Sequence, residues 1–94
     1  MSGVAAPGTR WRRVDDVLTR RTARSVLVLV PESRQPLVLA GAATAVWDVL
    51  AHAVDDSELV DRVAAQLAVD AQRARDEVVS TRVALQRAGA VVEA

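Results

Sequence analysis

Residues 36–50, PLVLAGAATAVWDVL, decide the fold that this sequence predicts. The apolar run LVL at residues 37–39 lies between a proline and a glycine, which is typical of a short strand with a buried face. After the glycine, apolar residues recur at helical spacing, at Ala43, Val46, Trp47 and Leu50. A strand that passes into a helix within about two residues brings the helix back over its own sheet. We therefore expect the centre of the core at this joint.

The composition predicts one small domain with a core of small side chains. The chain has 94 residues, of which 51% are hydrophobic and only 2% aromatic, with no Phe and no Tyr. The core must then consist of Val, Leu and Ala around the buried ring of Trp47. Trp11 stands among Arg10, Arg12 and Arg13, so we expect it to be partly exposed.

The chain divides into a strand half and a helix half. We expect a flexible N-terminal tail over residues 1–13 and a folded domain over residues 14–92. Strands are predicted at residues 14–22, 25–30 (SVLVLV) and 36–40, with a polar hairpin connection at 32–35. Helices are predicted at residues 42–53, at 58–68 with Ser57 as N-cap, and from the N-cap Asp70 to Ala88, where Gly89 ends the helix. The predicted fold class is α+β, a three-stranded antiparallel sheet followed by three helices.

The third predicted helix carries two apolar stripes. One contains Ala74, Val78, Thr81, Leu85 and Ala88. Val79 and Val83 form the second, and Arg75, Arg82 and Gln86 lie between the two. Two stripes indicate contact on two sides of the helix. The alternative is that Val79 and Val83 meet the sheet or a second copy of the chain, while the arginine stems lie along them.

Charge and residue usage exclude several function classes. The formal net charge is zero, but the first forty residues are basic and the remainder is acidic, a layout that orients a charged partner or only reflects solvated strands. With one His, no Cys, no Lys and no glycine-rich phosphate loop, we expect no enzyme, no metal site and no cofactor. The apolar runs are far shorter than the roughly 20 residues that cross a bilayer, so we expect no membrane contact. The absence of Cys, and so of disulfides, is compatible with the cytoplasmic location that we expect.

The joint and the third helix resemble the PqqD-like family. At the joint, the matching residues are Leu39, Ala43, Ala45, Val46 and Trp47, while Ala40 and Gly41 stand where the family has Asn-Pro. Further along, the matching residues are Val69, Asp70, Asp76, Glu77, Val78, Leu85 and Gly89. Members of this family are RiPP recognition elements, winged-helix-like modules that bind the leader segment of ribosomally synthesised precursor peptides.

The resemblance implies a mode of binding and a set of partners. The leader is expected to add as an antiparallel strand to the edge formed by Leu37, Val38 and Leu39. Its side chains are expected to enter a groove walled by Arg75, Val78, Val79 and Arg82. The implied partners are the precursor peptide and a maturation enzyme, such as a radical SAM enzyme, a leader protease or a cyclase. A homodimer is compatible with the sequence.

Two alternatives belong to other function classes. The first is a structural or dimerisation module. The second is a winged-helix DNA-binding protein, since arginines line the third helix at positions 73, 75, 82 and 87. Asp70, Asp76 and Glu77 are interleaved with these arginines and the net charge is zero, so we expect no nucleic acid as partner.

Overall fold

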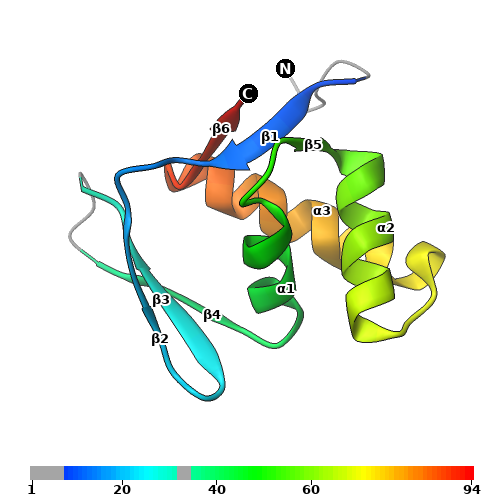
Figure 1. The fold of residues 1–94 in the computed structure, drawn as a ribbon, viewed down its shortest axis with the longest axis horizontal. Coiled ribbons are helices and arrows are strands. Elements are labelled where there is room, and N and C mark those ends of the chain that lie inside the picture. The colour runs from blue at the N-terminus through cyan, green and yellow to red at the C-terminus, as the bar shows by residue number, and fades with distance from the viewer. Residues whose placement is uncertain (1–7, 32–34) are drawn as a thin grey trace.

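The computed structural model describes residues 8–31 and 35–94, and its fold is α+β (Figure 1). In chain order the elements are β1 (Arg10–Arg13), β2 (Leu18–Arg21), β3 (Ser25–Leu29), β4 (Leu37–Ala40), α1 (Ala42–Val49), β5 (Val54–Asp55), α2 (Asp56–Leu67), α3 (Ala71–Arg87) and β6 (Val91–Glu93). The strands form two antiparallel sheets of three strands each. The prediction of a single sheet is therefore wrong, while the α+β class is confirmed.

The sheet β2-β3-β4 is the predicted antiparallel meander. In β3, Val26 and Val28 are buried and alternate with half-buried residues, so one face of the sheet packs on the core. The first strand of the meander is shorter than predicted and begins only at Leu18, because the chain before it links the two sheets. The predicted connection at residues 32–34 lies outside the described residues.

The second sheet, β5-β1-β6, was not predicted. Its central strand is Arg10–Arg13, which we expected in the N-terminal tail, and it pairs Trp11 with Val54 on one side and with Glu93 on the other. These strands have only four, two and three residues, too few for an alternating pattern to stand out. Residues 1–7 of the predicted tail lie outside the described residues.

Local signals explain most helix boundaries. The Asp70 carboxylate accepts a hydrogen bond of 2.8 Å from the Gln72 N–H, which confirms the predicted cap of α3, and Gly89 follows that helix at φ +82°. The predicted cap of α2 was wrong, because Asp55 takes that role and accepts 2.8 Å from the Glu58 N–H. Before α1, Gly41 adopts φ 60° and ψ −132°, a conformation that essentially only glycine adopts.

The core confirms one tryptophan prediction and overturns the other. Trp47 is 1% exposed and lies among the apolar residues of all three helices and the meander. Trp11 is only 2% exposed, so the expected partial exposure is wrong. Its strand β1 lies between β5 and β6, and the ring belongs to the buried apolar cluster. Arg13 on the same strand also turns inward, with its guanidinium carbon 5.0 Å from the centroid of the Trp47 ring. The three arginines around Trp11 concealed its burial in the sequence.

Candidate functional site

Strand β4 is an edge strand. The order β2-β3-β4 leaves one side of β4 without a neighbouring strand in the part of the chain that the structure describes. Leu39 is 7% exposed and Leu37 packs partly against the core, whereas Val38 between them is 65% exposed. The predicted edge, Leu37 to Leu39, is therefore an edge in the structure, and its side chains alternate between core and solvent.

The hydrogen-bond pattern shows which backbone groups of β4 face outward. The Thr22 N–H donates to the Ser25 carbonyl at 2.9 Å, so the backbone groups of Ser25 point toward β2. Because these groups alternate along an antiparallel strand, those of Val26 and Val28 point toward β4.

Val26 and Val28 are paired with Leu39 and Leu37, whose backbone groups therefore bond to β3. The N–H and C=O groups of Val38 and Ala40 then point away from the sheet. The edge presents two donors and two acceptors, spaced as an added strand requires.

The predicted α3 residues do not share one surface. Arg75 is exposed, Val79 is half-buried against the core, and Val78 is 1% exposed within the core. Arg82 is the exception among the charged residues, since only 2% of its surface is exposed. The predicted seam of Arg75, Arg82 and Gln86 is therefore not a uniform polar surface.

Arg82 is held inside the protein by three side chains. Its Nε and Nη2 donate to the two carboxylate oxygens of Asp56 at 2.9 and 2.6 Å, and its Nη1 donates to the Gln86 Oε1 at 2.7 Å. The guanidinium carbon lies 4.1 Å from the centroid of the Trp11 ring. These contacts occupy the N–H donors and one flat face of the guanidinium. Arg82 therefore connects β1, α2 and α3 and is not available to a ligand.

This network was not predicted, because Asp56 lies between the first two predicted helices and Trp11 in the predicted N-terminal tail. The one available signal was the spacing of Arg82 and Gln86, which is i to i+4 on a helix and lets the two side chains meet. Nothing in the local sequence pointed to Asp56, which lies 26 positions from Arg82.

The side of α3 that approaches the meander is a different one. A hollow of about 480 Å³ lies between the start of α1, the α2–α3 link and the first turns of α3. Its lining residues are Ala42, Leu67, Ala68, Val69, Asp70, Arg73, Ala74, Glu77 and Val78. Leu67 and Val69 are both well exposed there. Since Ala42 follows β4 after one glycine, this hollow adjoins the end of the edge strand.

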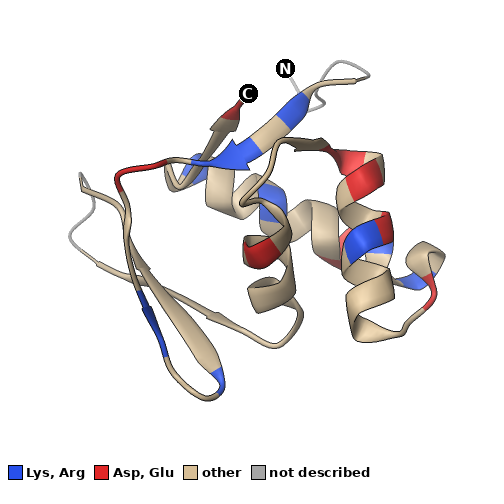
Figure 2. Ribbon diagram, in the orientation of Figure 1, with Lys and Arg blue, Asp and Glu red and all other residues tan. Residues whose placement is uncertain are grey.

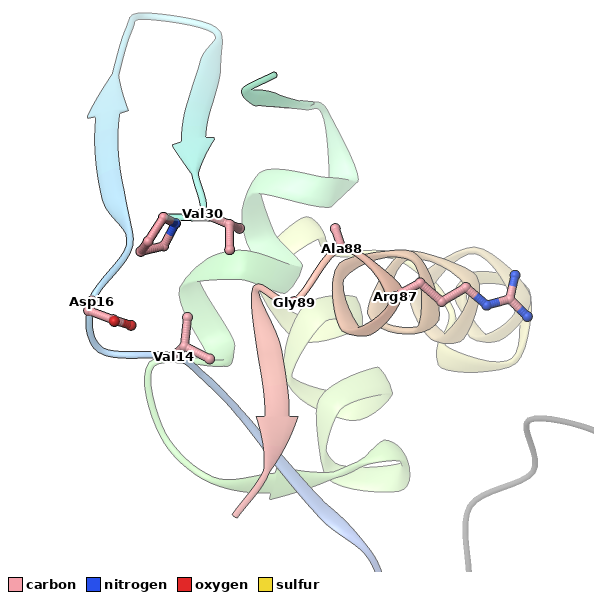
Figure 3. Close-up of a pocket in the computed structure, with 7 residues that line it drawn as sticks. Val14, Asp16, Val30, Arg87, Ala88 and Gly89 are labelled. Atoms are coloured by element: carbon pink, nitrogen blue, oxygen red, sulfur yellow. The ribbon is translucent and has the colours of Figure 1, made fainter. Parts of the chain in front are cut away.

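A second hollow of about 600 Å³ lies at the other end of α3 (Figure 3). Val14, Asp16, Val30 and Pro31 line one side of it and Arg87, Ala88 and Gly89 the other. Between the two hollows, a shallow surface on α3 is formed by Asp76, Glu77, Ser80, Thr81 and Ala84. The face of α3 beside the meander thus carries Ala74, Glu77, Thr81 and Ala88, on the opposite side of the buried stripe from Arg75 and Val79.

The family comparison fits this geometry. A family model described as coenzyme PQQ synthesis protein D (PqqD) matches residues 25–91, from β3 to the first residue of β6. The chain belongs to the PqqD family. The matched range contains the β4 edge, the α3 residues that line the two hollows, and the Asp56–Arg82 pair. Trp11 and β2 precede the matched range. Comparison with curated proteins and with solved structures gives no match.

Within residues 8–31 and 35–94, no three His, Asp or Glu side chains gather in a way that would hold a metal ion. None of the helices described is both long enough and apolar enough to cross a bilayer.

Proposed function

We propose that this PqqD-family chain binds the leader segment of a ribosomally synthesised precursor peptide and presents it to a maturation enzyme. The observation that carries the proposal is the open β4 edge, with the backbone groups of Val38 and Ala40 directed outward. An extended peptide that pairs with this edge becomes the fourth strand of the meander. In this role the chain is a binding module and not an enzyme.

Main-chain hydrogen bonds supply the affinity of such a complex, and side-chain hollows supply its selectivity. An added strand directs alternate side chains toward the core side of the sheet, where α3 lies. The hollow lined by Leu67, Val69 and Ala74 takes an apolar leader residue, and Arg73 and Glu77 at its rim select the polarity of the neighbouring ones.

The α3 residues that we propose to meet the leader differ from the predicted set. Val78 is kept, because it lines the hollow beside β4. Arg82 is omitted, because its donors are bound to Asp56 and Gln86. Arg75 and Val79 lie on the other side of α3, and Arg75 becomes a useful control position.

Hydrogen exchange tests the edge. The probe is a synthetic peptide with the leader sequence of a precursor identified among the neighbouring reading frames, added at saturation. The Val38 and Ala40 amides should exchange rapidly in the free protein and slowly in the complex, whereas Leu37 and Leu39 should already be protected by β3. Protection of another surface with no change at Val38 and Ala40 would show that the leader binds elsewhere.

The same edge favours a second candidate, a dimerisation module. Two copies that pair through β4 form a continuous antiparallel sheet of six strands, because an edge strand is its own complement in that orientation. Sedimentation of the protein without peptide separates the two functions. A dimer whose Val38 and Ala40 amides are protected before any leader is added would favour the dimerisation module.

A further inference from the structure

The outer face of the meander is apolar and nothing in the described chain covers it. Residues on this face alternate with the buried ones, so Leu27 and Leu29 of β3 share it with Leu18 of β2 and Val38 of β4. Leu18 is 71% exposed and Val38 65% exposed, the two highest values among the large exposed apolar residues of the described chain.

The sequence of β3 is that of a strand buried on both faces. The run VLVL at residues 26–29 is apolar at every position, a pattern typical of strands with both faces covered, while strands with one solvated face alternate with polar residues. In the structure Val26 and Val28 are buried, whereas Leu27 and Leu29 on the other face are only half-buried. The face that carries Leu27 and Leu29 therefore has the apolar composition of a sheet face that is covered by another element.

Among the residues described, the charges around this face are all positive. Arg20 lies in one cross-strand row with Leu27 and Val38, and Arg24 stands in the β2–β3 turn (Figure 2). Neither arginine has an ion-pair partner among the residues described, whereas Arg21 on the opposite face is bound to Asp48 at 2.7 Å. The described residues of the sheet and its hairpin include no carboxylate.

We infer that this outer face, formed by Leu18, Leu27, Leu29 and Val38 with Arg20 and Arg24 at its rim, docks a protein surface with an apolar centre and carboxylates at its edge. Charge complementarity decides against a second copy, because two such faces would bring together four arginines and no acid from the described residues of the sheet. Of the described acids that precede the sheet, Asp15 is paired with Arg12 and Asp16 lines the hollow on the core side.

The position of the face indicates which protein this is. Val38 contributes its side chain to the outer face and its backbone to the open edge, so a protein on this face would also lie against a peptide bound at the edge. We assign the face to the maturation enzyme that receives the leader, an assignment that rests on the proposed function. The enzyme and the leader would then occupy adjoining but separate parts of the meander.

The test measures enzyme binding and leader binding separately on the same variants. The probes are a purified maturation enzyme identified among the neighbouring reading frames, without leader, and the synthetic leader peptide. Arg20→Glu and the double variant Leu18→Thr/Leu29→Thr should each weaken enzyme binding by about tenfold or more, because they remove the charge match and the apolar centre. Threonine retains the strand preference, and none of these residues belongs to the β4 edge, so leader binding should stay within about twofold.

Matched controls lie away from the meander. Arg62→Glu reverses an exposed charge on α2, and Val92→Thr changes an exposed valine of β6, so neither should alter enzyme binding. If enzyme binding is unchanged in the outer-face variants, the inference is overturned. That result would not contradict the proposed leader binding. Failure of the wild-type chain to bind leader would instead refute the proposed function, while the enzyme measurement still decides the face. A wild-type dimer that these variants convert to monomers would assign the face to a second copy.

Discussion

At the scale of single residues, the Arg82 guanidinium is the most constrained polar group of the described chain. It is a buried charge whose removal from water is offset by a bidentate carboxylate, an amide oxygen and an aromatic face. Such a group stabilises the fold only while its partners are present. The pair also fixes the start of α2 against the middle of α3.

Removal of Asp56 should therefore be costly. Asp56→Ala leaves the Arg82 charge buried without its counter-ion and should lower the free energy of unfolding by about 3 kcal/mol in urea denaturation. The double variant Asp56→Ala/Arg82→Met should recover much of that loss, because it removes the charge as well. The exposed pair of Arg62 and Glu58 is the control, and Arg62→Ala should change stability by less than about 1 kcal/mol. Equal effects at the two sites would show that the buried pair has no special role.

The two tryptophans should behave alike in spectroscopy. Both rings are buried, so both should emit at short wavelength in the folded state and shift to the red on unfolding. Trp47→Ala should cost about 3 to 5 kcal/mol, which is close to the whole stability of a domain of this size. A Trp11→Leu variant isolates the Trp47 signal, and red-shifted native emission in that variant would contradict the burial of Trp47.

At the scale of elements, the β4 edge makes proline a selective probe. Val38→Pro removes an outward N–H that β3 does not use, and edge strands tolerate proline at such positions. It should abolish leader binding while circular dichroism shows the helices unchanged. Leu39→Pro is the matched control, because it removes a donor to β3 and should disrupt the meander itself. Undiminished leader binding by a folded Val38→Pro protein would exclude strand addition at this edge.

Two residues with positive φ should respond in opposite directions. Gly41 adopts a conformation that other residues avoid, and no atom lies within 4 Å of a Cβ added there, so Gly41→Ala should destabilise by about 1 to 3 kcal/mol through the backbone alone. Ala68 ends α2 at φ 57°, and Ala68→Gly should stabilise by about 0.5 to 1 kcal/mol. Thermal unfolding measures both, and a change of the same sign in the two variants would contradict the backbone argument.

Elements with a strong local signal could be predicted from the sequence, and elements without one could not. The meander could be predicted from its run of β-branched and leucine residues. The bounds of α3 could be predicted from Asp70 and Gly89, because a cap and a positive-φ glycine affect only the adjacent turn of the helix. The edge at Leu37 to Leu39 was implied by the resemblance to the PqqD-like family, and the strand order agrees with it. The network of Arg82 could not be predicted, because its partners Trp11 and Asp56 come from segments that only the unpredicted second sheet brings together.

At the scale of the whole molecule, the charges distinguish peptide from nucleic acid. Figure 2 shows acidic and basic residues intermixed on the helices, while the basic residues of the meander stand on its hairpin. Leader binding that depends on main-chain bonds should weaken only modestly between low and physiological salt. Duplex DNA of random sequence should not compete for the leader. Tight DNA binding with a steep log–log dependence on salt would place the chain among nucleic-acid binding proteins instead.

The small sheet that joins β1 and β6 gives the chain a mechanical property. Its outermost bond runs from the Ala94 N–H to the Arg10 carbonyl at 2.9 Å, so the two strands meet with the chain ends on the same side. A force that pulls the two ends apart therefore breaks the bonds of this pair one after another, like a zipper, and does not shear them together. Under load the protein should open first at Arg10 and Ala94 and then at Trp11, while the β4 edge, which belongs to the other sheet, keeps its shape.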